Sequence, residues 1–129
     1  MATGFPAATG DVLTSSMFNG LVAFTANTQT GTTYTAVSTD QYQVLVTMNN
    51  ASANAFKIPT NASVAFPTGT VITVLNLGAG TCTISAVASG TTTVVSAGSV
   101  AASPTLGQYK AGTCIKTGTD TWVICGAIS

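Results

Sequence analysis

The stretch from Asn49 to Leu77 constrains the fold more than any other part of the chain, because its apolar residues recur at every second position. Phe56 and Ile58 share one face of an extended segment, and residues 64 and 66 repeat the spacing after a Pro-Thr-Asn break. A second break, Pro-Thr-Gly, precedes the longer β segment 71–77. Alternation with period two, broken by Pro, Gly and Asn, is typical of short antiparallel strands.

The same alternation extends over most of the chain and predicts one all-β domain. We expect strands at 33–37, 43–48, 71–77, 81–87 and 91–96, and a final hairpin formed by 109–116 and 121–125. Segment 71–77 carries apolar side chains on both faces, which predicts a central strand that is covered twice. The expected fold over residues 31–129 is a compact antiparallel β-sandwich or barrel-like domain of about eight short strands. The sequence has no fixed repeat period, so we do not expect a solenoid.

Residues 1–30 differ from the rest and are predicted to form an extended N-terminal arm. The arm holds one short helical turn at most, capped by Thr14 or Ser15 and ended by Gly20. Its apolar side chains are too large to remain in water, so we expect them to dock on this domain, on a neighbouring subunit or on a larger particle. The expected contact residues are Phe5, Val12, Leu13, Met17, Phe18 and Leu21.

Charged residues are scarce, and this scarcity excludes several functions. The 129 residues include three lysines and three aspartates, with no Arg, Glu or His, so 5% of the chain is charged against an average of about 25%. Nucleic-acid binding requires a basic stripe, which three scattered lysines do not form. A membrane helix requires about 18 consecutive apolar residues, and the sequence has no such run. We therefore expect neither nucleic acid nor membrane as a partner. Low charge favours packing against copies of the chain or a larger particle over a soluble monomer.

His and Glu, which often serve as general acids and bases, are absent from the sequence, so no enzyme activity is predicted. Asp40 and Asp120 fall in expected turns, where Asp bonds to nearby backbone groups. Lys57, Lys110 and Lys116 are expected to be solvated. No catalytic residue, cofactor or metal site is predicted.

Three cysteines, Cys82, Cys114 and Cys125, do not suit a disulfide framework because their number is odd. We expect small, buried or half-buried free thiols, although Cys114 and Cys125 lie on one predicted hairpin and a bridge between them stays open. Free thiols indicate assembly in a reducing cytoplasm.

Three aromatic residues, Tyr34, Tyr109 and Trp122, are candidates for a ligand or subunit contact. Trp122 and Tyr109 together form a possible sugar-stacking platform. A single Trp on a terminal strand is more often a core or interface anchor.

Several short motifs occur in an order that resembles a small β module of tailed-bacteriophage virion proteins. These motifs are residues 48–75 (MNNASANAFKIPTNASVAFPTGTVITVL), the Gly78-Ala79-Gly80 turn and the closing run Ile115-Lys116-Thr117-Gly118-Thr119-Asp120-Thr121-Trp122 with Gly126. The start Gly10-Asp11-Val12-Leu13-Thr14, followed by Phe18-Asn19, is similar to the start of small virion proteins.

This resemblance implies a non-enzymatic virion component, made and assembled in the host bacterial cytoplasm and located on the virion surface. The function expected first is a capsid-surface decoration (cement) protein, a homotrimer whose arm docks on the major capsid protein. Such a protein stabilises the shell by mass action, because it binds only the assembled form. The alternative is a tail-fibre or tail-tip module that binds a host receptor glycan through exposed aromatic side chains.

Overall fold

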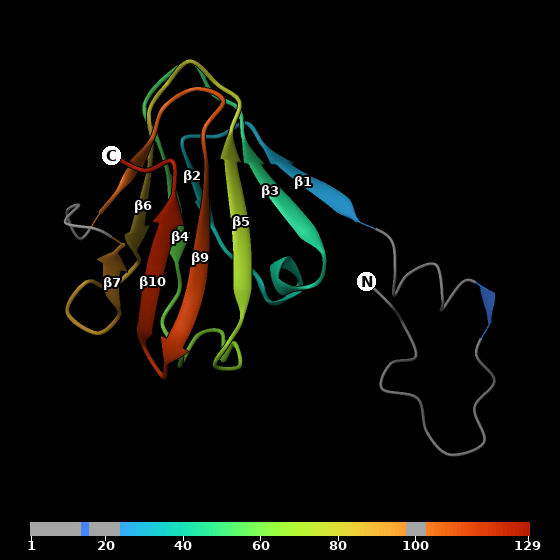
Figure 1. Cartoon of the computed structure of the whole chain (residues 1–129), viewed down its shortest axis with the longest axis vertical. Coiled ribbons are helices and arrows are strands. Elements are labelled where there is room, and N and C mark those ends of the chain that lie inside the picture. Colours follow the sequence, from blue (N-terminus) through green and yellow to red (C-terminus); the bar gives the residue numbers. More distant parts are fainter. Residues whose placement is uncertain (1–13, 16–23, 98–102) are drawn as a thin grey trace.

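A computed structural model gives the structure of the chain and describes residues 14–15, 24–97 and 103–129. The described residues form ten strands and one short 3-10 helix, so the all-β prediction is confirmed (Figure 1). The strands are β1 Thr25–Gln29, β2 Thr33–Thr35, β3 Val44–Met48, β4 Asn54–Ile58, β5 Val71–Asn76, β6 Cys82–Ala86, β7 Thr93–Ser96, β8 Thr105–Leu106, β9 Ala111–Gly118 and β10 Thr121–Gly126, and the 3-10 helix η1 spans Ser38–Gln41.

The strands belong to two sheets, and the chain alternates between them. One sheet has the order β1-β3-β5-β9-β10-β7, and the other has the order β2-β4-β6-β8. The β1-β3-β5 and β2-β4-β6 neighbours are all parallel, whereas β8 pairs antiparallel with β6.

The prediction of an antiparallel domain is wrong, because five of the eight strand pairings in the described chain are parallel. Period-two alternation specifies which side chains face the core, but it does not specify the direction of the neighbouring strand. The Pro-Thr-Asn and Pro-Thr-Gly breaks lie between β4 and β5, where the chain passes from one sheet to the other. The length of chain between paired residues also differs from one parallel pair to the next, since Thr25 pairs with Val44 whereas Leu45 pairs with Thr73. This difference explains why no repeat period is visible.

Most predicted strand positions are confirmed, but residues 64–66 do not form a strand. Backbone bonds from the Ser63 and Val64 N–H groups to the Thr60 carbonyl, both 3.0 Å, close a turn there. Phe66 is nevertheless buried, because its ring packs edge-to-face on Trp122 with centroids 5.6 Å apart. The predicted final hairpin is confirmed as the antiparallel pair β9 and β10.

One hydrophobic cluster contains side chains from both sheets. Phe56 and Ile58 point inward and are fully buried, whereas Lys57 between them faces outward, as predicted. The cluster consists of Ala36, Val46, Met48, Phe56, Ile58, Phe66, Ile72, Val74, Cys82, Ile84, Val94, Leu106, Cys114, Trp122 and Ile124.

The sheet begins before the boundary that we predicted at residue 30. Residues 25–29 form β1, which pairs with β3 at one edge of the six-stranded sheet (Figure 1). The predicted arm contacts Phe5, Val12, Leu13, Met17, Phe18 and Leu21 lie outside the described residues.

Candidate functional site

The outer face of the six-stranded sheet carries no charge. The only charged residue in its six strands is Lys116, and Lys116 points inward with 2% of its surface exposed. Six valine, leucine and isoleucine side chains on the outer face are half-buried or exposed, and we call them the apolar face. They are Leu45, Val71, Leu75, Val95, Ile115 and Val123.

The strand register places the apolar face on neighbouring strands. Ile115 of β9 pairs with Val71 of β5 on one side and with Val123 of β10 on the other, so the three side chains form a row across the sheet. β5 lies inside the sheet, as its sequence predicts, and Ile72 and Val74 cover its inner face. Val71 on its outer face remains 49% exposed. No part of the described chain fully covers this face.

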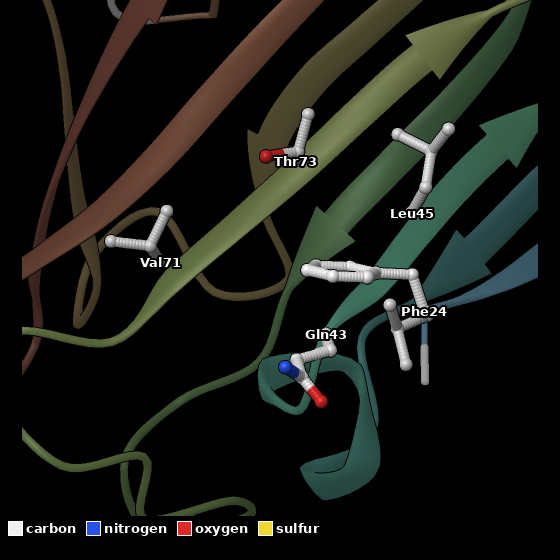
Figure 2. Close-up of a pocket in the computed structure, with 6 residues that line it drawn as sticks. Phe24, Gln43, Leu45, Val71 and Thr73 are labelled. Atoms are coloured by element: carbon white, nitrogen blue, oxygen red, sulfur yellow. The ribbon is translucent and has the colours of Figure 1, made fainter. Parts of the chain in front are cut away.

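An open hollow of about 250 Å³ lies at the β1 side of the apolar face. Figure 2 shows the Phe24 ring beside Leu45 and Gln43, with Val71 and Thr73 on the neighbouring strand. Phe24 is 81% exposed, although it is a large aromatic residue. Exposed aliphatic and aromatic side chains that gather in one place are typical of interaction sites.

The outer face of the four-stranded sheet differs from the apolar face. Its outward residues are mainly threonine and serine, together with Lys57, and include Thr33, Thr35, Ala55, Lys57, Thr83, Ser85 and Thr105. The two sheets therefore present surfaces of different character to their surroundings.

The structure does not bring Tyr34, Tyr109 and Trp122 together in one exposed platform. Trp122 is 1% exposed and belongs to the core, whereas Tyr109 is 73% exposed in the turn before β9. Tyr34 lies on β2, with its ring 6.1 Å from that of Phe56. A sugar-stacking pair of Trp122 with Tyr109 is therefore wrong for this chain.

Asp40 is a buried structural group that joins three segments. It lies in η1 and is 2% exposed. Its carboxylate accepts hydrogen bonds from the Tyr34 hydroxyl at 2.7 Å, the Val37 backbone N–H at 2.9 Å and the Asn27 side-chain amide at 3.0 Å. Burial, followed by the hydrogen bond to Asp40 and its charge, raises the pKa of Tyr34 to about 12.

The raised pKa of Tyr34 predicts a loss of stability in alkali. The folded protein holds the phenolic proton more tightly than the unfolded chain, whose Tyr pKa is near 10.0. This contribution is complete below about pH 10 and is lost as the pH rises towards about 12. In urea unfolding at several pH values, the stability gap between wild type and Tyr34→Phe should be constant below pH 10.0 and should narrow above it. A gap that does not change with pH would contradict this assignment.

Lys116 is buried, and the expectation that it is solvated is wrong. Its Nζ donates to Asn61 Oδ1 at 2.6 Å and to the Phe66 carbonyl at 2.7 Å. The nearby Asp120 carboxylate accepts from the Asn61 backbone N–H at 2.8 Å and from the Thr92 hydroxyl at 3.1 Å. The alternation of residues 112, 114 and 116 on the inner face is the sequence feature that places Lys116 inside.

The three cysteines are free, and Cys114 and Cys125 do not pair. Ile124 lies opposite Cys114, and Cys125 lies opposite Thr113, so the two thiols point to opposite faces of the sheet. Burial raises the pKa of the Cys82 thiol to about 11 and also raises the pKa of Cys114. Both of these thiols therefore stay protonated at neutral pH.

Within residues 14–15, 24–97 and 103–129, no three His, Cys, Asp or Glu side chains gather where they would hold a metal ion. In the same part of the chain, no helix is long and apolar enough to cross a membrane.

Comparison with known proteins identified no relative, since no family model, no curated protein and no solved structure matches the chain.

Proposed function

We propose that the chain is a non-enzymatic structural protein of a bacteriophage virion, a capsid-surface decoration protein that stabilises the shell. The uncovered apolar face on the six-stranded sheet is the observation that carries the assembly role. The resemblance of residues 48–75 and 115–126 to a virion β module supports the assignment to a phage particle. In this proposal the two sheets are the layers of a β-sandwich, and an N-terminal arm precedes it.

The partner of the apolar face is a second copy of this chain. The face has no charged side chain, so identical faces meet without desolvating charges. Its middle row, Val71, Ile115 and Val123, is aliphatic across three strands. These side chains are already partly buried, so covering them adds part of the about 1.5–3 kcal/mol that full burial of each would contribute. Homo-oligomers are usually closed and symmetric, and we propose a trimer in which the apolar faces of three copies converge on a threefold axis.

The arm supplies the contact with the shell. The described sheet begins at Thr25, next to the exposed Phe24. The preceding residues include the apolar side chains Val12, Leu13 and Phe18, which we propose dock on the major capsid protein. A protein that binds the assembled shell, and not its free subunits, stabilises the shell by mass action.

One observation favours the alternative of a tail-fibre module that binds a receptor glycan. Tyr109 is 73% exposed, and Gln108 beside it is exposed and polar. An exposed aromatic ring with polar neighbours suits a sugar. The sequence analysis paired Tyr109 with Trp122 as a sugar-stacking platform. Since Trp122 is buried, Tyr109 is the member of that pair that could contact a glycan.

A lysine in the centre of the apolar face should prevent self-association. We expect Ile115→Lys to be monomeric where the wild-type protein sediments as a trimer, because assembly would bury an unpaired charge. Sedimentation equilibrium over a range of concentrations measures the difference, and circular dichroism checks that the variant folds.

The matched control is Thr83→Lys, which places the same charge on the outer face of the four-stranded sheet. This variant should associate like the wild type. The proposal that the apolar face is the subunit contact would be contradicted if the wild-type protein stays monomeric or if Ile115→Lys still forms trimers.

A further inference from the structure

The polar cluster around Lys116 brings a buried amine and the side-chain amide of a half-buried asparagine together at the edge of the core. Lys116 lies on β9, and its Nζ is 2.6 Å from the Asn61 side-chain oxygen. Asn61 belongs to the segment between β4 and β5, 55 residues earlier in the chain. We propose that the two side chains become joined by an intramolecular isopeptide bond between Lys116 Nζ and Asn61 Cγ.

The geometry places the reacting atoms close together before any reaction. A carbonyl carbon lies about 1.23 Å from its oxygen, so Lys116 Nζ, 2.6 Å from the Asn61 oxygen, lies within about 3.8 Å of Cγ. Reacting atoms that are held about 3–3.5 Å apart and aligned gain most of the advantage of proximity. Rotation of the Asn61 amide about its side-chain bond turns the face of the amide towards Nζ.

The reaction is balanced without a co-reactant. The Nζ–Cγ bond forms and the Cγ–Nδ2 bond of Asn61 breaks. Two protons of the Lys116 ammonium pass to the departing nitrogen, which leaves as ammonium. The positive charge therefore leaves the core with the ammonium ion, and no oxidation or reduction takes place.

The surroundings of Lys116 favour the neutral product. In the described chain, Lys116 Nζ donates to two uncharged oxygens, of Asn61 and of the Phe66 backbone, and an ammonium group with neutral partners is costly in a core. An isopeptide removes this charge and keeps one N–H, which still reaches the Phe66 carbonyl. Trp122, which pairs with Lys116 across β9 and β10, and Phe66 are both buried and exclude water.

Asp120 acts as a positioning residue for this reaction. Its carboxylate accepts a hydrogen bond from the Asn61 backbone N–H at 2.8 Å and another from the Thr92 hydroxyl at 3.1 Å. These contacts hold the Asn61 backbone beside β9. In Asp120→Ala we expect a smaller linked fraction in protein that is still folded, and Asp120→Asn, which keeps an acceptor oxygen, should restore it.

Intact-mass spectrometry of the full chain tests the proposal. The wild-type protein should be lighter than its sequence by one ammonia molecule. Lys116→Arg and Asn61→Ala should both show their full sequence masses. Lys57→Arg is the matched control, because Lys57 faces outward on β4, and it should show the same loss as the wild type.

Peptide mapping separates the isopeptide from ring closure of Asn61 with its own backbone, which also releases ammonia. In the linked protein, trypsin should not cleave after Lys116, and fragmentation should show one branched peptide that contains both residues. The proposal is overturned if wild type has its full sequence mass, or if the loss persists in Lys116→Arg. Circular dichroism shows that Lys116→Arg is folded, and Lys116→Met provides a second test if it is not.

Discussion

Replacement of Phe56 with alanine should lower the free energy of unfolding by about 3–5 kcal/mol, the usual cost of removing a buried aromatic ring. Phe56 is fully buried on β4, and its ring lies 6.1 Å from that of Tyr34. Because neighbouring strands hold the site on both sides, the structure cannot collapse to fill the cavity. Urea unfolding followed by circular dichroism measures the change.

Phe24→Ala is the matched control for Phe56→Ala, since it removes the same side chain from a site that is 81% exposed. Its effect on stability should lie within about 0.5 kcal/mol. Similar losses in the two variants would show that the faces of β4 are assigned wrongly.

Removal of the Asp40 carboxylate should have the next largest effect. Asp40→Ala leaves the Tyr34 hydroxyl and the Val37 N–H without this acceptor, whereas the Asn27 amide keeps the Tyr34 oxygen. An unsatisfied buried group costs about 1–3 kcal/mol, so these two partners together predict a loss of roughly 2 kcal/mol or more. Urea unfolding at neutral pH gives the value.

A double-mutant cycle shows whether this loss arises from the proposed contacts. Tyr34→Phe should cost clearly less in the Asp40→Ala background than in the wild type, because the hydroxyl has already lost its acceptor. Additive effects would mean that the Tyr34–Asp40 contact contributes nothing to stability. Asp40→Asn keeps an acceptor oxygen and should recover part of the loss.

The sequence predicted the strands and their faces well, but among the strand pairings it predicted only the final hairpin of the described chain. Phe56 and Ile58 were assigned to the core correctly, because alternation follows from the pleat of any strand. The direction of a neighbour depends on where the connecting segment goes. Here the connections cross between two sheets, and neither their composition nor their length shows this.

One buried group was missed because residue type was given more weight than position. Lys116 was assigned to solvent as a lysine, although its place in the alternation of β9 put it inside. Phe66 was placed in the core correctly, but it reaches the core from a turn and not from a strand. The pairing of Lys116 with Asn61 was not visible in the sequence, since 55 residues separate them.

One feature of the sequence indicated the apolar face. Residues 71–77 are apolar on both faces, which predicts a strand covered twice. The structure covers the inner face and leaves Val71 49% exposed on the outer one. The missing cover is what the proposed second copy supplies.

Immunogold labelling of purified virions with an antibody to this chain tests the central proposal most directly. The proposal predicts gold spread over the phage head, with no label on heads of a mutant phage that lacks the protein. Gold confined to tails or fibres would favour the glycan-binding alternative and make Tyr109 the next residue to replace. Absence of label from every particle would contradict a virion role of either kind.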